Sequence, residues 1–269
     1  MGDKVKSISK SNKKEESEDT VTIQKLSIFL YKGETWLDVP VHENCNAEEI
    51  CILVAKSLKF RPVSLQLFAL RIRKSDIWLP LCFNLNSFPP NHQLEFRLRF
   101  KVPILIEISR LDDSAFDYLF HQMRFDFLHG AIPEVSSDQS KSEALGLCVT
   151  DMLRCIQEDG TPREHIESNY RQFIPKGIYK QHMFFLKKRI QDNLSRLLNR
   201  DRPKNVRFIK EQYISQMEEL TTSYFAEDFC AMAFKNENYP ASIRVQPYHP
   251  EFPGVSMTYA GKQNVCFLI

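Results

Sequence analysis

Apolar and polar residues alternate in short runs over the first third of the chain, which is typical of half-buried strands. The strands that this pattern predicts cover residues 21–31, 35–41, 65–72, 77–81 and 94–100. One helix lies between them, because Asn46 and Glu49 have the spacing of a helix cap and apolar residues then recur at every fourth position as far as Lys59. Pro62 ends this helix. Residues 21–102 are therefore predicted to form a small mixed domain with the order β-β-α-β-β-β.

Residues 112–225 carry apolar side chains at spacings of three and four, which predicts amphipathic helices. The predicted helices cover residues 113–128, 142–158, 178–199 and 204–224. Asp113 and Ser114 are expected to cap the first helix, and Gly130 suits the left-handed position just past its end. Short connections between the helices favour a compact four-helix bundle, which residues 103–111 link to the first domain.

The two ends of the chain differ from this pattern. Residues 1–20 hold five lysines, five acidic residues and no aromatic residue, which predicts a disordered tail. Residues 226–269 contain candidate strands at 229–234, 243–246 and 255–259, separated by prolines. Three short strands without a covering helix bury little apolar surface, so we expect this last part to be an incomplete domain.

Composition excludes several classes of site. The chain is 43% hydrophobic and 26% charged, as in ordinary globular proteins. Its 8 glycines are widely spaced, which excludes the glycine-rich loops that bind dinucleotides or nucleotide phosphates. The 7 cysteines are odd in number and form no C-x-x-C motif, which indicates free thiols in a reducing cytoplasm. No catalytic residue and no cofactor is therefore expected.

Several segments, taken together, resemble one protein family. In the first domain these are Ala47-Glu-Glu-Ile-Cys-Ile52, Leu67-Phe-Ala-Leu70 and Leu94-Glu-Phe-Arg-Leu-Arg-Phe100. In the helical part they include Tyr118-Leu-Phe-His-Gln122, Asp126-Phe-Leu-His-Gly130 and Lys187-Lys-Arg-Ile190. The series is similar to the N-terminal FERM domain of the Janus kinases. The resemblance implies an α+β fold with three lobes: a ubiquitin-like β-grasp, a four-helix acyl-CoA-binding-protein-like bundle and a partial PH-like β lobe.

The same resemblance implies a function in docking. A module of this kind would bind the proline-rich, juxtamembrane tail of a cytokine-type receptor at the cytoplasmic face of a membrane, in JAK-STAT-type signalling. The Src-homology-2-like, pseudokinase and kinase domains of that family do not follow here, so we expect no enzymatic activity from this chain. The alternative is a membrane–cytoskeleton linker of the same broad fold that binds phosphoinositides.

A basic segment is the first candidate site. Twelve lysines and arginines lie between Arg171 and Lys210, opposed only by Asp192 and Asp201. Such a local positive field suits anionic lipid of the inner leaflet or an acidic receptor tail, with nucleic acid disfavoured. The residues expected to make these contacts are Lys187, Lys188, Arg189, Arg196, Arg200 and Arg202. A solvated helix face is the alternative interpretation of the same charges.

The second candidate is an apolar groove for the receptor peptide. The resemblance places Val149 and Thr150 on one helix of the bundle, and Leu186 and Leu197 on the next. An extended proline-rich peptide needs a pre-formed apolar groove, because it brings apolar rings at little entropic cost. For any one of the four residues, an ordinary buried place in the bundle core is the favoured alternative.

Metal and lipid sites receive less support. The residues His121, His129, His182 and Cys148 do not have the spacing of a zinc site, so we expect no metal centre from them. Cys148 and Cys155 lie one heptad apart and are expected to pack in the core. The last four residues, Cys266-Phe-Leu-Ile269, fit the C-a-a-X pattern of prenylation, although an apolar end also arises when a chain is cut inside a domain.

Overall fold

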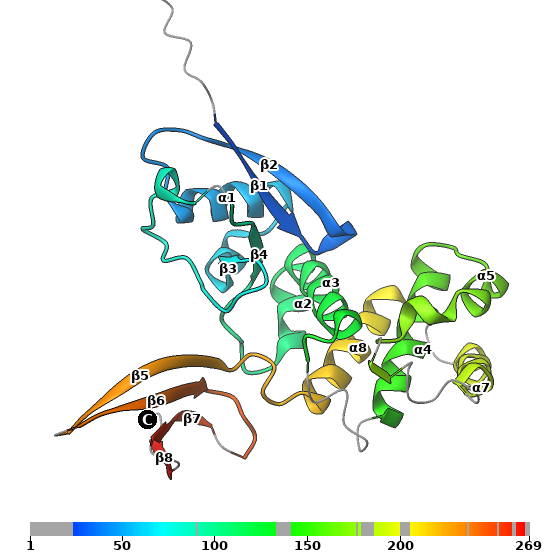
Figure 1. The fold of residues 1–269 in the computed structure, drawn as a ribbon. Helices are drawn as coiled ribbons and strands as arrows, with labels where there is room; N and C mark the ends of the chain where they lie inside the picture. Colours follow the sequence, from blue (N-terminus) through cyan, green and yellow to red (C-terminus); the bar gives the residue numbers. More distant parts are fainter. Residues whose placement is uncertain are drawn as a thin grey trace, which may run out of the picture.

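The computed structural model describes residues 24–89, 91–132, 141–175, 177–178, 186–199, 205–235, 237–251, 253–259 and 262–266. The predicted tail at residues 1–20, together with Arg200 and Arg202, lies outside these residues. Figure 1 shows three parts in chain order: a sheet with one helix, a group of helices and a second sheet. The helical group lies between the two sheets along the chain, and it contacts the first sheet.

The first sheet contains β1 (Gln24–Leu30), β2 (Thr35–Val41), β3 (Phe68–Ile72) and β4 (Leu94–Leu98), in the order β2-β1-β4-β3. The strands β1 and β2 form the predicted hairpin, and β1 and β4 run parallel. Helix α1 (Ala47–Ser57) follows β2, and its Ile50 and Val54 are buried. The side chain of Asn46 accepts a hydrogen bond from the Glu49 amide at 2.9 Å. The predicted cap is therefore confirmed.

Two predicted strands of this lobe are wrong or shortened. Residues 77–81 form no strand; Trp78 only makes an isolated bridge to Arg71. The strand expected from residue 65 begins at Phe68, because Pro62–Leu67 forms a 3-10 helix. Pro62 stands at the start of that turn, where its fixed φ favours a helical conformation and its missing N–H costs nothing. The described lobe thus has the order β-β-α-β-β.

The helical part contains more helices than predicted. They are α2 (Ile108–Leu111), α3 (Asp113–His129), α4 (Lys141–Glu158), α5 (Arg163–Ser168), α7 (Leu186–Leu198) and α8 (Val206–Leu220). The cap of α3 is Asp112, one residue before the predicted pair, and it accepts hydrogen bonds from the amides of Ser114 and Ala115. Gly130 ends α3 with a left-handed φ of 71°, as predicted. Residues 103–111, the predicted linker, contain a 3-10 turn and α2.

The second sheet has four antiparallel strands among the described residues, not three. They are β5 (Glu227–Lys235), β6 (Glu237–Gln246), β7 (Gly254–Tyr259) and β8 (Lys262–Cys266), in sequence order. The strand β8 escaped prediction because its residues Lys262-Gln-Asn-Val-Cys266 lack the alternation of apolar and polar positions. Among the described side chains of this sheet, Ala241 and Ser256 are buried.

An aromatic cluster joins the first sheet to the helices. The rings of Phe60, Phe68 and Phe96 lie 5.7, 5.9 and 5.9 Å from the ring of Tyr118 on α3, centre to centre. The Tyr118 hydroxyl donates a hydrogen bond of 2.6 Å to the Phe96 carbonyl oxygen, which satisfies its polar end in the core. The first lobe and the helical lobe therefore share one continuous hydrophobic core.

Candidate functional site

The four residues of the expected groove differ in accessibility. Val149 on α4 and Leu186 on α7 are buried in the hydrophobic core, at 1% and 5% exposure. Thr150 is half-buried, and its hydroxyl donates a hydrogen bond to the Gly146 carbonyl oxygen of the preceding turn. Leu197 is half-buried and packs against the core. Helices α4 and α7, which carry these four residues, contact each other. Of the four side chains, only those of Thr150 and Leu197 are partly accessible.

Helix α7 separates charge from apolar side chains. Leu186, Ile190 and Leu194 are buried on one face. The cations on the solvent side are Lys187, Lys188, Arg189 and Arg196, all of them exposed. The described residues place no carboxylate within ion-pair distance of these four side chains. Four of the six predicted anion-contact residues therefore form one surface, which we call the α7 basic face.

On α8 the cations of the basic segment are paired with carboxylates. Lys210 is 4% exposed, and its Nζ lies 2.5 Å from Asp117 Oδ1 and 2.6 Å from Glu158 Oε1. Arg207 pairs with Asp113 at 3.0 Å and with Glu211 at 3.2 Å. Both cations are paired with carboxylates, Lys210 in the interior and Arg207 at the surface, so the twelve basic residues of the segment overstate the positive field that a partner meets.

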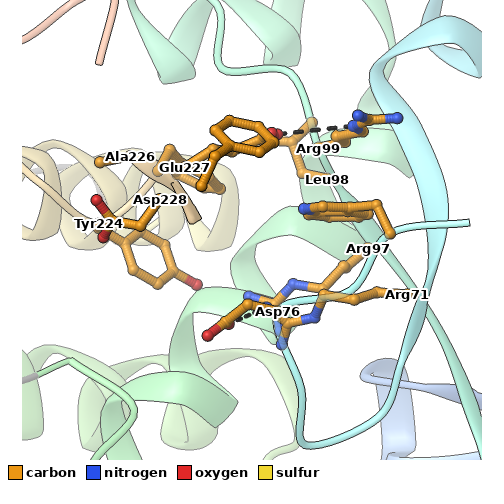
Figure 2. A pocket seen from close by; sticks show the side chains of 12 residues that line it. Arg71, Asp76, Arg97, Leu98, Arg99, Tyr224, Ala226, Glu227 and Asp228 are labelled. Atoms are coloured by element: carbon orange, nitrogen blue, oxygen red, sulfur yellow. Dashed lines mark ion pairs between the residues drawn. The ribbon is translucent and has the colours of Figure 1, made fainter. Parts of the chain in front are cut away.

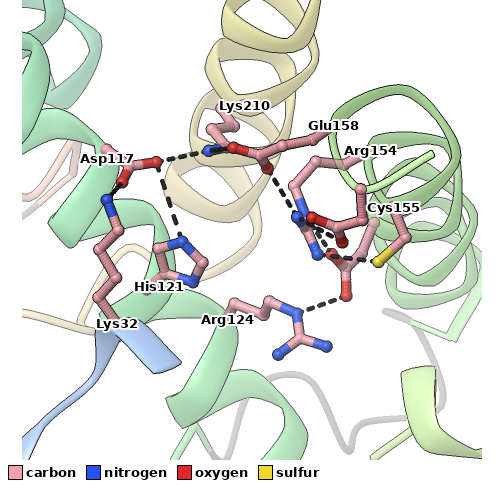
Figure 3. Close-up of polar contacts among 10 residues, drawn as sticks. Lys32, Asp117, His121, Arg124, Arg154, Cys155, Glu158 and Lys210 are labelled. Carbon is pink, nitrogen blue, oxygen red and sulfur yellow. Dashed lines mark hydrogen bonds and ion pairs between the residues drawn. The ribbon is translucent and has the colours of Figure 1, made fainter. Parts of the chain in front are cut away.

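Lys210 belongs to an ion network between three helices, which Figure 3 shows. Asp117 of α3 also contacts Lys32, from the β1–β2 turn, at 2.6 Å. Glu158 of α4 accepts from Arg154 at 2.7 Å, and Arg154 in turn donates to Asp151 at 2.9 Å. The network ties α3, α4 and α8 to the tip of the first hairpin.

The network shifts the titration of its members. Burial alone would raise the pKa of Asp117, but the hydrogen bonds from Lys210 and Lys32 prevail and lower that pKa to about 2. Burial lowers the pKa of His121 to about 4, and the nearby Asp117 carboxylate only partly opposes this. His121 is therefore a neutral, partly buried side chain at physiological pH, in agreement with its expected structural role. Cys148 and Cys155 are buried as predicted, and burial raises the pKa of each thiol.

A pocket of about 200 Å³ lies where the first sheet meets the start of β5 (Figure 2). Three arginines line it, and each has a carboxylate within ion-pair distance: Arg71 with Glu95 at 2.6 Å, Arg97 with Asp126 at 2.6 Å and Arg99 with Glu227 at 3.6 Å. The pocket is thus a charge-balanced junction. It does not present a set of free cations to a small anion.

Arg97 is the centre of that junction. Its guanidinium donates to the Tyr31 hydroxyl oxygen at 2.6 Å and to Asp126 Oδ2 at 2.6 Å. The Tyr224 hydroxyl donates to the same Asp126 oxygen. Burial raises the pKa of both tyrosines, so both hydroxyls stay protonated. Side chains from the first lobe, α3 and the segment before β5 are therefore linked through the buried Arg97–Asp126 pair.

One cluster of metal-ligating residue types was missed by the sequence analysis. His42, Cys45 and Glu49 place one potential ligand atom each within 4.8 Å of one another. Their spacings of three and four residues are those of zinc ligands, but they bridge the end of a strand and the start of a helix. The spacing of these three residues in the sequence is a signal from which this cluster could have been predicted.

The last candidate, Cys266, ends β8, and its side chain lies outside the described residues together with residues 267–269. Prenylation of Cys266 thus remains a prediction. None of the helices in the described part of the chain has the length and apolar character needed to cross a bilayer.

Family models match two parts of the chain. Residues 25–104 match the FERM F1 ubiquitin-like domain, and residues 109–220 match the FERM F2 acyl-CoA binding protein-like domain. The matches coincide with the first sheet and the helical group, so the predicted fold class is confirmed.

Curated relatives are tyrosine kinases. The chain is 29% identical to the tyrosine-protein kinase hopscotch of Drosophila melanogaster over 200 residues, which cover 70% of this chain and 17% of the kinase. It is 24% identical to the tyrosine-protein kinase JAK1 of Danio rerio over 277 residues, which cover 82% of this chain and 23% of the kinase. The chain thus spans about a fifth of the length of these relatives.

Solved structures agree on the fold. The FERM domain of Drosophila Merlin, in complex with its C-terminal domain, superposes with a TM-score of 0.62 at 14% identity, covering 88% of this chain and 76% of that one. The Dictyostelium discoideum myosin VII MyTH4-FERM MF2 domain gives a TM-score of 0.61 at 14% identity, covering 87% of this chain and 48% of that one.

Proposed function

Because the chain belongs to the FERM family and is a JAK-like FERM module, we propose that it binds the proline-rich, membrane-proximal tail of a cytokine-type receptor at an anionic membrane surface. The proposal includes a location at the cytoplasmic face of that membrane. The α7 basic face is the single observation that carries it.

The α7 basic face has the properties that an anionic surface requires. Lys187, Lys188, Arg189 and Arg196 are exposed on a helix whose opposite side is fixed in the core by Ile190 and Leu194. The cations are thus held on one side of a firmly packed helix. Each basic residue close to an anionic membrane contributes about 1 kcal/mol. Four of them supply about 4 kcal/mol, which orients a docked module but does not hold it alone.

The receptor peptide would add the remaining affinity. Thr150 and Leu197 are the partly accessible members of the predicted groove, whereas Val149 and Leu186 support it from the core. A peptide that reaches the α4–α7 surface would meet apolar side chains and the neighbouring cations together. Apolar contacts would dominate the peptide affinity, and the cations would dominate the membrane affinity and its dependence on salt.

The experiment compares two binding reactions of the purified chain. Calorimetry measures binding of a proline-rich receptor-tail peptide in solution, and flotation measures binding to phosphatidylcholine vesicles with and without phosphatidylserine. Reversing Lys187, Lys188 and Arg189 to Glu should weaken binding to the anionic vesicles by at least about 100-fold. Thr150→Arg should abolish peptide binding without weakening vesicle binding, because the added side chain is itself basic.

A matched control reverses three exposed lysines of the first lobe, Lys56, Lys59 and Lys74, to Glu. This variant has the same net charge as one with three cations of α7 reversed, and it should bind both targets like the wild type. Equal losses in the two triple variants would show a general charge effect and overturn the role of α7. Peptide binding that survives Thr150→Arg would overturn the groove.

The phosphoinositide-binding linker is the second candidate, and the α7 basic face suits it as well. Vesicles containing phosphatidylinositol bisphosphate separate the two functions. Strong binding to these vesicles, combined with no detectable binding of receptor peptides, would favour the linker over the receptor-docking module.

A further inference from the structure

We propose that His42, Cys45 and Glu49 form a three-ligand site for a transition-metal ion of the zinc class. The site lies in the first lobe, at the junction of β2 and α1, and it is independent of the α7 basic face.

Local backbone structure brings the three ligands together. β2 ends at Val41, and a turn follows in which the Cys45 amide donates to the His42 carbonyl oxygen at 3.1 Å. Asn44 takes a left-handed φ of 64° inside this turn. Asn46 then caps α1, which places Glu49 in the first turn of that helix. The chain thus reverses direction within a few residues, and the three side chains converge.

The donor set is that of zinc. The imidazole nitrogen, the thiolate sulfur and the carboxylate oxygen are all common zinc ligands. With a neutral imidazole, one thiolate and one carboxylate, the site carries two negative charges and exactly neutralises a divalent cation. Binding forms a metal–sulfur bond and releases the thiol proton of Cys45 to solvent.

The imidazole of His42 is oriented for ligation. Its Nδ1 lies 2.8 Å from the Glu43 carbonyl oxygen, which can only accept, so Nδ1 carries a hydrogen. In the neutral ring, Nε2 then offers its lone pair, as in metal-bound histidines whose second nitrogen donates to a carbonyl. Nε2 lies 2.9 Å from Glu49 Oε2. Two acceptors at this distance share a proton, and a zinc ion that replaces the proton would separate them to about 3.3 Å or more.

The site combines a fixed ligand with two adjustable ones. Cys45 is 1% exposed, and its carbonyl oxygen accepts a hydrogen bond of 3.0 Å from the Leu85 amide. The side chains of His42 and Glu49 are 67% and 42% exposed, so they can move by the small distance that closes the site. Tetrahedral zinc needs neighbouring ligand atoms about 3.3–3.7 Å apart, compared with the present limit of 4.8 Å.

The test uses Co²⁺ as a spectroscopic probe on the full chain. Thiolate ligation of Co²⁺ gives a charge-transfer absorption in the near ultraviolet, which a proton-bridged His42–Glu49 pair cannot produce. We expect this band to reach its full intensity at one Co²⁺ per chain and to disappear when Zn²⁺ is added. Cys45→Ser should abolish the band, and His42→Ala and Glu49→Gln should each weaken Co²⁺ binding by at least about tenfold.

Cys82→Ser is the matched control, because Cys82 is an exposed thiol in the adjacent loop. It should leave the band unchanged. Since Cys45 is buried and its variant can fail to fold, His42→Ala provides the decisive readout: Zn²⁺ should raise the melting temperature of the wild type but not of this variant. A missing band, a band that survives Cys45→Ser, or an equal Zn²⁺ shift in His42→Ala would overturn the proposal.

Discussion

Replacement of the buried Lys210 by Met tests whether the ion network of α3, α4 and α8 stabilises the helical lobe. Met keeps most of the volume of the aliphatic stem but removes Nζ, which contacts Asp117 at 2.5 Å and Glu158 at 2.6 Å. Removing one partner of a buried ion pair costs about 3–5 kcal/mol, because the remaining charge is left uncompensated. Asp117 retains Lys32 and Glu158 retains Arg154, so we expect about 3 kcal/mol, the lower end of that range.

The pH dependence of the unfolding free energy gives a second measure of what the contacts of Asp117 contribute to stability. The pKa of Asp117 falls from 3.8 to about 2 on folding, because the two lysine contacts outweigh burial. This shift corresponds to about 2.4 kcal/mol at 1.36 kcal/mol per pKa unit. Screening by solvent reduces it to about 1–2 kcal/mol, since Asp117 is partly exposed. A folded-state pKa below the unfolded value stabilises the protein above pH 3.8, and this stabilisation is lost as the pH falls through about 2.

Urea denaturation followed by circular dichroism measures both effects. At pH 7, Lys210→Met should lose about 3 kcal/mol of unfolding free energy. Between pH 4 and pH 2, its stability should fall less steeply than that of the wild type, because the pKa of Asp117 returns toward its ordinary value. Lys188→Met, at an exposed cation of α7, is the control and should change stability by less than about 0.5 kcal/mol. A Lys210→Met protein as stable as this control, or with an unaltered acid slope, would refute the reasoning.

Three further substitutions test other parts of the structure. Leu186→Asp places a carboxylate in the core and should cost more than about 3 kcal/mol, so a variant with the wild-type urea midpoint would contradict the burial of Leu186. Tyr224→Phe removes the donor to Asp126 and should cost about 1–3 kcal/mol in the same assay; unchanged stability would show that this hydrogen bond contributes nothing. Gly130→Ala forces a side chain into a left-handed φ of 71° and should lower the unfolding free energy by about 1 kcal/mol, whereas a higher melting temperature would be inconsistent with that conformation.

Local signals in the sequence predicted much of the fold. The β1–β2 hairpin, the Asn46 cap and the Gly130 end of α3 all depend on neighbouring residues, so the sequence alone was sufficient to place them. The strand predicted at residues 77–81 does not form. Pairing with β3 depends on tertiary packing, which the alternation of apolar and polar residues does not reveal, and within this segment Trp78 alone forms a bridge to β3.

The site was less accessible to sequence reasoning. The family resemblance placed Leu186 on a helix of the bundle, but it could not distinguish a core position from one that lines an open groove. A count of basic residues could not reveal that Lys210 turns inward, because its partners Asp117 and Glu158 are distant in sequence. The cluster of His42, Cys45 and Glu49 was detectable from spacing, but its convergence depends on the turn around Asn44.

The meeting of three segments at Arg97 limits how the chain can be recombined. The Arg97 guanidinium donates directly to Tyr31 and Asp126, and Tyr224 donates to the same Asp126 carboxylate, so residues from separate parts of the fold depend on one another. A chimera that takes one lobe from a relative would keep the interacting residues of the other parts unchanged. Any mismatch at this junction would leave a buried charge without its partner. Grafts between relatives should therefore carry all four positions as a unit if the hybrid is to fold.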